Sequence, residues 1–209
     1  ELFVVRATST AGAVGGPPVD SRPLDDVDAA AGAALVPGRL AAVDAGRRVA
    51  MLEGGDLLTY DHLIVAVGAR PEPHLRGALT FAGPADGRAF RAMLDRAAGH
   101  GGRGQAPRLV IVVPPGTPWP LVAYELALLS ASYLDGRGAR DALDIRIVTS
   151  EDSALAIFGP QAGAAVARDL AAAGIALRTG TLVREWRWGR LELVGGEAER
   201  ADRVVALPV

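Results

Sequence analysis

Residues with the chemistry to hold a nucleotide follow an apolar run at residues 109–113. Gly116 lies in the loop after this run, and a second apolar stretch, residues 121–134, is predicted to be a helix. A glycine-containing loop between a strand and a helix binds phosphate through backbone N–H groups and the helix N-terminus. Glu151 follows the next predicted strand, residues 144–149, at the place where an acid binds a ribose hydroxyl group in such a fold. It lies 35 residues after Gly116, against about 20 in the usual arrangement, so a solvated loop carboxylate is the preferred interpretation.

A second apolar run, residues 62–67, stops abruptly at Gly68-Ala69-Arg70-Pro71. Continuous apolar residues without alternation favour a parallel strand that is covered on both faces. Gly68 and Ala69 have almost no side chain, so another molecule can approach their backbone closely. Pro71 restricts Arg70 to an extended conformation and turns the chain out of the sheet. The pattern predicts a buried strand with a ligand contact at its end.

This segment resembles a signature of two-dinucleotide-binding flavoproteins. The signature consists of the Tyr60-Asp61 pair, the predicted strand, and the Gly68-Ala69-x-Pro71 sequence that ends it. This family includes type II NADH dehydrogenases, sulfide:quinone reductases and pyridine nucleotide-disulfide oxidoreductases. The resemblance implies an FAD-dependent oxidoreductase that passes electrons through a flavin to or from a small acceptor such as a quinone. It also implies that FAD in the full-length protein lies against Gly68, Ala69 and Arg70, with the adenine near Leu40.

The same resemblance indicates a degenerate NAD(P) site. The sequence Tyr-Glu-Leu-Ala at residues 124–127 is similar to the end of the glycine motif in relatives, and counting back places Pro118, Pro120 and Ala123 at the three glycine positions. Proline removes the N–H groups that would bind a phosphate, so NAD(P) binding is doubtful. Relatives carry a glutamate near the nicotinamide and flavin at the position of Glu125. The alternative for Glu125 is a carboxylate paired with an arginine at a domain interface, because a buried carboxylate needs a partner.

The order of the predicted elements indicates the fold class. From residue 108 onward they alternate as β-α-β-α-β, which is half of a doubly wound nucleotide-binding domain. Short runs separated by Gly and Pro turns predict an antiparallel β-meander. Its expected strands are residues 33–36, 39–43, 48–51 and 57–60. We therefore expect an α/β protein with a Rossmann-like doubly wound parallel sheet and a β-meander, a partial two-dinucleotide-binding-domain architecture. Residues 1–82 are expected to be a partial FAD-binding domain with meander and connector, and residues 83–209 an NAD(P)-binding-like domain.

Composition excludes several kinds of chemistry. The 209 residues contain no cysteine, which rules out disulfides, thiolate metal sites and cysteine-based redox steps. A net charge of −2 without a basic cluster argues against nucleic acid as a partner. The three histidines have no metal-ligand spacing, so no metal is expected. No apolar run reaches the length of about 18 residues that a transmembrane segment needs. We expect a cytoplasmic location, with a parent protein peripheral to a membrane as the alternative.

Two motifs of the flavoprotein family are missing from the sequence. No G-x-G-x-x-G motif for the FAD pyrophosphate is present before residue 33, and the Gly-Asp pair expected after Leu207 is absent. We therefore expect an internal fragment whose partner is the remainder of a flavoprotein chain, with a possible homodimer and no FAD held by the isolated chain. The alternative is a catalytically inactive Rossmann-like scaffold or a dimerisation module. No catalytic residue is identified by either interpretation.

Overall fold

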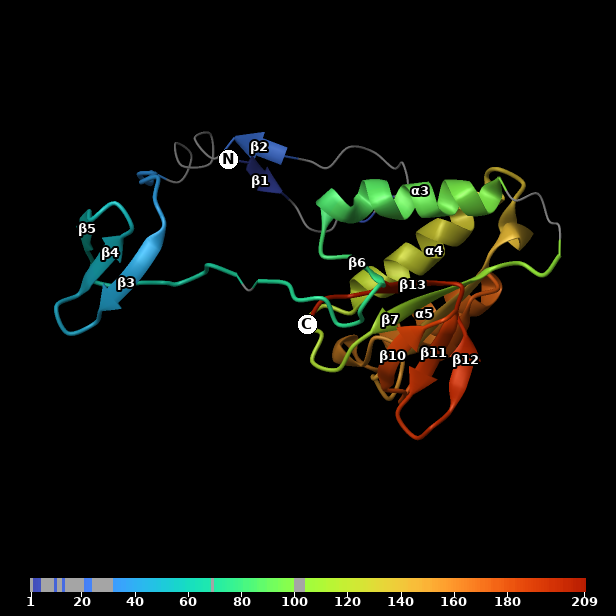
Figure 1. Cartoon of the computed structure of the whole chain (residues 1–209). Coiled ribbons are helices and arrows are strands. Elements are labelled where there is room, and N and C mark those ends of the chain that lie inside the picture. Colours follow the sequence, from blue (N-terminus) through green and yellow to red (C-terminus); the bar gives the residue numbers. More distant parts are fainter. Residues whose placement is uncertain are drawn as a thin grey trace. The chain divides into compact units, whose positions relative to one another are not determined.

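The computed structural model describes residues 2–4, 10, 13, 21–23, 32–68, 70–99 and 104–209. The chain divides into two compact units, which are considered separately below. Unit 1 comprises Glu1–Phe3 and Ser21–Arg70, and unit 2 comprises Val4–Asp20 and Pro71–Val209. The helices and strands are labelled in Figure 1. Two short strands, β1 (Leu2–Val4) and β2 (Ser21–Pro23), form a two-stranded sheet.

Unit 1 contains the antiparallel meander. Its strands are β3 (Leu40–Asp44), β4 (Val49–Leu52) and β5 (Leu57–Thr59), in the order β3-β4-β5. Ala50 and Leu52 are buried whereas Met51 between them is exposed, which is the period-2 pattern of a half-covered strand. The three-stranded meander is confirmed, but its predicted first strand at residues 33–36 is wrong. Residues 33–36 are exposed, and no strand among the described residues pairs with them, so their apolar composition alone does not make them a strand.

The predicted buried strand at residues 62–67 is also wrong. The chain there has no regular secondary structure, and Ile64 and Val67 are 91% and 76% exposed. A strand forms when neighbouring backbone accepts and donates its hydrogen bonds. Within the described part of the chain no strand pairs with these residues, so their apolar composition alone does not bury them.

Unit 2 is built on a five-stranded sheet in which every pair is parallel, in the order β6-β13-β7-β8-β9. The strands are β6 (Leu79–Thr80), β7 (Arg108–Val113), β8 (Asp144–Thr149), β9 (Ala176–Arg178) and β13 (Arg203–Ala206). In the register of the central strand, Val112 pairs with Ala206 on one side and with Val148 on the other. The expected α/β fold with a parallel sheet is confirmed.

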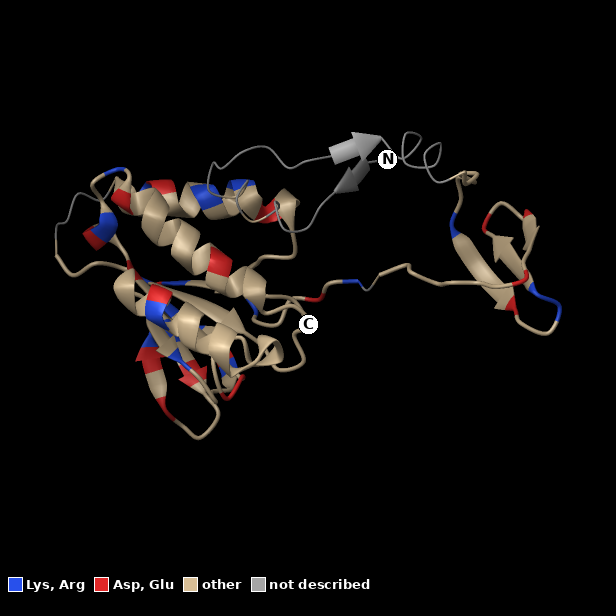
Figure 2. Cartoon of the chain, turned by 180° about the vertical axis from the view of Figure 1, so that it is seen from behind, with Lys and Arg blue, Asp and Glu red and all other residues tan. Residues whose placement is uncertain are grey.

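Different layers cover the two faces of this sheet (Figures 1 and 2). One layer consists of α3 (Gly87–Ala98), α4 (Leu121–Asp135) and α5 (Pro160–Ala172), and the other of β10 (Val183–Arg187), β11 (Arg190–Leu193) and β12 (Ala198–Arg200). Ile111 packs in the cluster that contains the helices, whereas Val110 and Val112 pack in the cluster that contains β10 and β11. Because both faces are covered, β7 is apolar from Leu109 to Val113.

The described part of unit 2 also contains three short 3₁₀ helices: η2 (Pro84–Asp86), η3 (Arg140–Ala142) and η4 (Ala156–Phe158). The predicted helix over residues 84–98 is observed as η2 followed directly by α3. Among the described residues, no helix has the length and apolar character that crossing a membrane requires.

Candidate functional site

The order of the strands locates a candidate site in unit 2. The chain passes from β7 to β8 on one side, while β13 lies on the other side of β7, so the direction of winding changes between β7 and β13. In open α/β sheets, ligands bind at the carboxyl edge where this change occurs. After β13 the chain stays close to β7, since the Leu207 N–H donates to the Val112 carbonyl at 3.0 Å. The candidate site is therefore the loop after β7, residues 114–120, with its surroundings.

This loop folds back on itself. Gly116 has a φ of +77°, which a glycine adopts without strain. Thr117 donates to the Pro114 carbonyl twice, from its hydroxyl at 2.8 Å and from its N–H at 3.4 Å. Pro118 has no N–H, and Pro120 is the N-cap of α4 without any side-chain cap. The backbone donors left in the loop are those of Gly116 and Trp119.

An aromatic pair connects the loops that follow β7 and β8. The rings of Trp119 and Phe158 meet edge to face, with centroids 5.3 Å apart and planes at 80°. Phe158 ends η4, whose N-cap Leu155 has a left-handed backbone with a φ of +46°. Both rings are only partly buried, so they present aromatic surface where the glycine-rich loop of a dinucleotide fold would leave space.

The interpretation of Glu151 as a solvated loop carboxylate is wrong, because groups of the protein itself hold it. Its carboxylate accepts hydrogen bonds from the Tyr124 hydroxyl at 2.7 Å, the Thr149 hydroxyl at 3.0 Å and the Ala156 N–H at 3.1 Å. Tyr124 and Thr149 are fully buried. Burial raises the pKa of the Tyr124 hydroxyl above its ordinary value, and the hydrogen bond to Glu151 raises it further. Glu151 therefore joins α4, the end of β8 and η4.

Sequence reasoning missed the role of Tyr124. It stands in the mostly apolar first half of α4, and a buried tyrosine hydroxyl generally requires a hydrogen-bond partner. A tyrosine in this buried segment therefore predicts a hydrogen-bond acceptor nearby, and Glu151 is that acceptor. Thr149 carried a weaker signal, because it is the one polar residue in the second half of β8.

Glu125 lies one residue further along α4 and has a different environment. Its carboxylate accepts a hydrogen bond of 2.5 Å from the hydroxyl of Thr10, which is buried. No arginine is paired with it among the residues that the structure describes. The carboxylate is thus held by a neutral donor, which leaves its negative charge without a partner of opposite sign in the described part of unit 2.

The residues expected to contact FAD lie in unit 1. Gly68 has a φ of +71°, and apart from its chain neighbours no atom of the described residues lies within 4 Å of where its Cβ would be. Arg70 is exposed and has no hydrogen-bond or ion-pair partner among the described residues. Leu40 begins β3, pairs with Leu52 and is partly exposed. Ala69 lies outside the described residues.

No protein-family model matches the chain, and neither does any curated protein sequence. Solved structures do match. They include the sulfide:quinone oxidoreductase of Aquifex aeolicus (TM-score 0.82, 18% identity, 99% of this chain and 50% of that one). They also include a ferredoxin reductase of Rhodopseudomonas palustris (0.67, 19%, 97% and 48%) and the NDH2 of Plasmodium falciparum (0.69, 12%, 99% and 48%).

The chain therefore spans about half the length of these solved structures. At such low identity the likeness establishes the fold. The neighbours belong to the flavoprotein family that the residue 60–71 motif resembles, so the resemblance is confirmed at the level of the fold.

Proposed function

We propose that this chain is part of an FAD-dependent oxidoreductase that passes electrons through a flavin to or from a small acceptor such as a quinone. The observation that carries this proposal is the match of 99% of the chain to a sulfide:quinone oxidoreductase at a TM-score of 0.82, together with the Gly68 stop in the sequence. In this proposal the remainder of the protein completes the FAD site. In the same proposal, the remainder of the protein packs against the exposed apolar residues 63–67.

The residues of unit 1 fit a bound flavin nucleotide. The open, left-handed backbone at Gly68 would admit a ligand where any side chain would intrude. Arg70 offers an unpaired guanidinium, which forms strong hydrogen bonds to phosphate. When bound, the flavin would supply the electron-transfer chemistry, and the protein would hold and orient it.

The residues of unit 2 do not fit an NAD(P) pyrophosphate, and we propose that this site is degenerate. Pro118 and Pro120 offer no N–H groups, and the N–H of Thr117 is directed at Pro114. The Glu151 carboxylate, the candidate for a ribose contact, already accepts from three groups of the protein. Trp119, next to the N-cap residue Pro120, packs edge to face on Phe158. Glu151 is thus better explained as a structural residue, and no reaction step is assigned to a nicotinamide.

Flavin absorbance tests the first part of the proposal. The polypeptide from the complete reading frame should be purified beside the 209-residue chain. We expect flavin bands from the complete protein and none from the chain alone. Gly68→Val should abolish flavin binding, because it adds a side chain at the open backbone where the ligand is proposed to lie. Gly55→Val is the matched control, since Gly55 also has a positive φ of +91° with no neighbour within 4 Å of its Cβ position.

A complete protein without flavin would contradict the proposal and favour an inactive scaffold. Equal flavin retention in the Gly68 and Gly55 variants would contradict the site.

The nicotinamide half is tested by calorimetry with NADH, for which we expect a Kd of about 1 mM or weaker, which is about −4 kcal/mol. Replacing Pro118 and Pro120 by glycine should strengthen binding, whereas Pro115→Gly should not. Micromolar binding by the unmodified chain would show that the site is intact.

A further inference from the structure

A hollow of about 490 Å³ opens beside the end of α3 in unit 2. Besides α3, its walls come from residues 104–107 before β7, residues 141–143 before β8, and Arg203 at the start of β13. These three strands run parallel, so all three walls stand at the amino edge of the sheet. The candidate site follows the carboxyl end of β7, and the hollow therefore lies at the opposite edge.

The floor of the hollow is aliphatic. Met93 and Ala97 of α3 and Leu143 before β8 line it, and all three are buried. Earlier turns of α3 fill their side of the core with Phe90 and Leu94, whereas its last turn places a small alanine at the hollow. Among the described lining residues there is no aromatic ring. An alkyl chain suits such a floor better than a planar ring does, because methionine adapts to its shape and nothing offers a stacking surface.

The rim of the hollow carries a net positive charge. Its charged lining residues are Arg96, Arg203 and Asp141, two positive and one negative, which leaves one positive charge. Arg203 is exposed and donates from Nη1 to the Asp202 carbonyl at 2.7 Å, and the described part of the chain gives it no carboxylate partner. Its remaining N–H groups and the amide of Gln105 are donors at the same rim. A single surplus positive charge matches a monoanion.

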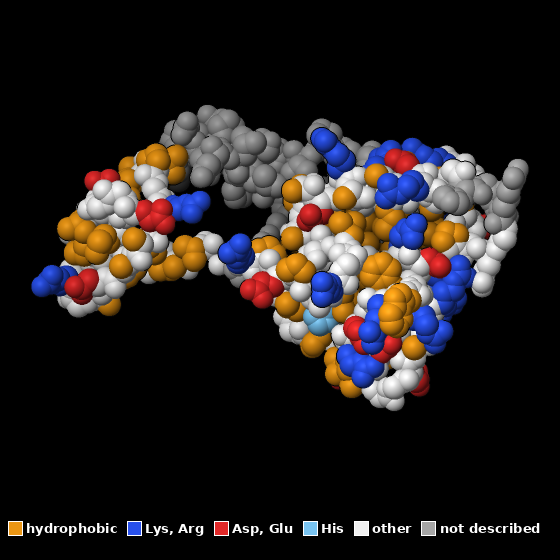
Figure 3. All heavy atoms as spheres, in the orientation of Figure 1, with side chains coloured by type: hydrophobic (Ala, Val, Ile, Leu, Met, Phe, Trp, Pro, Cys, Tyr) orange, Lys and Arg blue, Asp and Glu red, His pale blue; other side chains and the backbone are white. Residues whose placement is uncertain are grey.

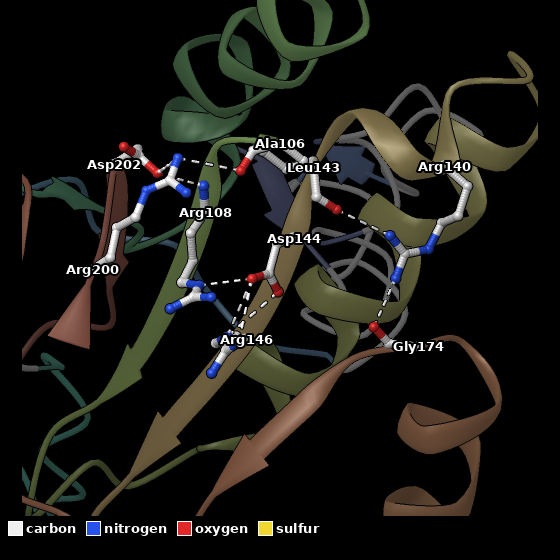
Figure 4. A network of polar contacts seen from close by, with 9 residues as sticks. All are labelled: Ala106, Arg108, Arg140, Leu143, Asp144, Arg146, Gly174, Arg200 and Asp202. Atoms are coloured by element: carbon white, nitrogen blue, oxygen red, sulfur yellow. Dashed lines mark hydrogen bonds and ion pairs between the residues drawn. The ribbon is translucent and has the colours of Figure 1, made fainter. Parts of the chain in front are cut away.

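The wall before β7 is held in place by its neighbours. Arg200 donates to the Ala106 carbonyl at 3.3 Å and pairs with Asp202 at 2.8 Å (Figure 4). The Asp144 N–H donates to the Pro107 carbonyl at 3.0 Å. These contacts connect the wall to β12 and β8, so this side of the hollow is formed without a ligand. A preformed wall lowers the cost of ordering the protein when a ligand binds.

We propose that this hollow binds an aliphatic monocarboxylate. Its alkyl chain would lie on Met93, Ala97 and Leu143, and its carboxylate would accept hydrogen bonds from the Arg203 guanidinium, which matches a carboxylate in geometry and charge. In Figure 3, apolar side chains lie below α3 with basic side chains among them, which is the surface that such an amphipathic ligand needs. The volume is within the range of roughly 300–1,000 Å³ that is usual for small-molecule sites. Because the hollow is at the amino edge, this binding is independent of the proposed flavin and nicotinamide sites.

Titration calorimetry of the full chain with decanoate tests the proposal. Decylamine has the same chain length and the opposite charge, and decyl phosphate carries a more highly charged head. We expect saturable binding of one decanoate, with decylamine at least about tenfold weaker. Adsorption to the exposed apolar residues 63–67 would take up both chains, so equal binding of decanoate and decylamine would overturn the proposal. Decyl phosphate binding more than about tenfold tighter than decanoate would show that the ligand class is wrong.

Matched substitutions locate the site. Arg203→Gln removes the guanidinium at an exposed position and should weaken decanoate binding at least about tenfold. Arg88→Gln, exposed in the first turn of α3, is its control and should bind as the unmodified chain does. Ala97→Leu should also weaken binding about tenfold, because it fills part of the hollow. Its control is Ala89→Leu, at an exposed position of the same helix.

Decanoate affinity that is unchanged in Arg203→Gln would overturn the proposal, as would an equal loss in Arg88→Gln. If Ala97→Leu lowers the stability to urea, the Arg203→Gln comparison decides alone. Hydrogen exchange gives an independent location: decanoate should slow exchange at residues 104–106 and 141–143. Slower exchange only in other parts of the chain would place the ligand elsewhere and contradict the site.

Discussion

Two apolar runs of nearly the same composition have opposite environments in this protein. Residues 109–113 of β7 are fully buried between β13 and β8 and covered on both faces. Residues 63–67 have no strand partner among the described residues and are exposed. The contrast shows that an apolar run favours burial, but that it is buried only where neighbouring strands and layers pack against it.

Hydrogen exchange should show the largest difference between the two runs. The amides of residues 109–113 are bonded within the central sheet, so they should exchange through global unfolding, several orders of magnitude slower than unprotected amides. The amides of residues 63–67 should exchange at close to the unprotected rate. Equal protection of the two runs would mean that residues 63–67 do pair, in solution, with a partner strand.

A matched pair of substitutions measures the same contrast as stability. Ile111→Ala removes a fully buried side chain and should lower the free energy of unfolding by about 2–5 kcal/mol. Ile64→Ala, at a residue 91% exposed, should change it by no more than about 0.5 kcal/mol. Urea unfolding followed by circular dichroism provides both values. A large loss in Ile64→Ala would break the comparison.

The ends of the two runs differ as well. Beyond β7, Tyr124 and Glu151 form a closed hydrogen-bonded network, whereas Gly68 is open. Tyr124→Phe removes a hydrogen bond to a carboxylate and should cost about 1.5–3 kcal/mol, with Tyr60→Phe as a control in unit 1. An unchanged stability of Tyr124→Phe would show that the network is not structural.

The same hydroxyl should produce an alkaline pH dependence. Because the pKa of Tyr124 is raised in the folded state, the neutral form stabilises the fold. This contribution is fully present below the ordinary tyrosine pKa of about 10 and is lost as the pH rises above that value. Unfolding measured at increasing pH should show a decline that is smaller in Tyr124→Phe.

The smallest expected effect on stability comes from a contact between α3 and α4, the helices that cover β7. The hydroxyl of Tyr133 on α4 donates to Asp95 on α3, and this bond, with help from Arg91, lowers the pKa of Asp95. Its contribution is therefore present above the ordinary aspartate pKa and is lost as the pH falls through the lower folded-state value. Asp95 is exposed, so thermal unfolding of Asp95→Asn should differ only slightly from that of the unmodified chain, and less at low pH. A difference that grew on acidification would contradict this assignment.

Much of unit 2 was predictable because its signals are local. A continuous apolar run identified β7, the β-α-β order placed β8 at residues 144–149, and the predicted helices over residues 121–134 and 160–173 differ from α4 and α5 by one residue each. Gly and Pro turns similarly located the meander in unit 1. The candidate site was less predictable. Gly116 and Glu151 were located correctly in the loops after β7 and β8, but the partners of Glu151 come from α4 and η4.

The sequence by itself determined where β7, α4, β8 and α5 occur in unit 2, since propensity and periodicity act over a few residues. It also determined that cysteine chemistry is absent. Only the tertiary structure decided which apolar run is buried and which remains exposed. It alone placed the Tyr124 hydroxyl on Glu151 and left Trp188 in solvent. The reason is physical: burial and hydrogen bonding require partners from distant parts of the chain, and those partners are brought together only when the layers pack.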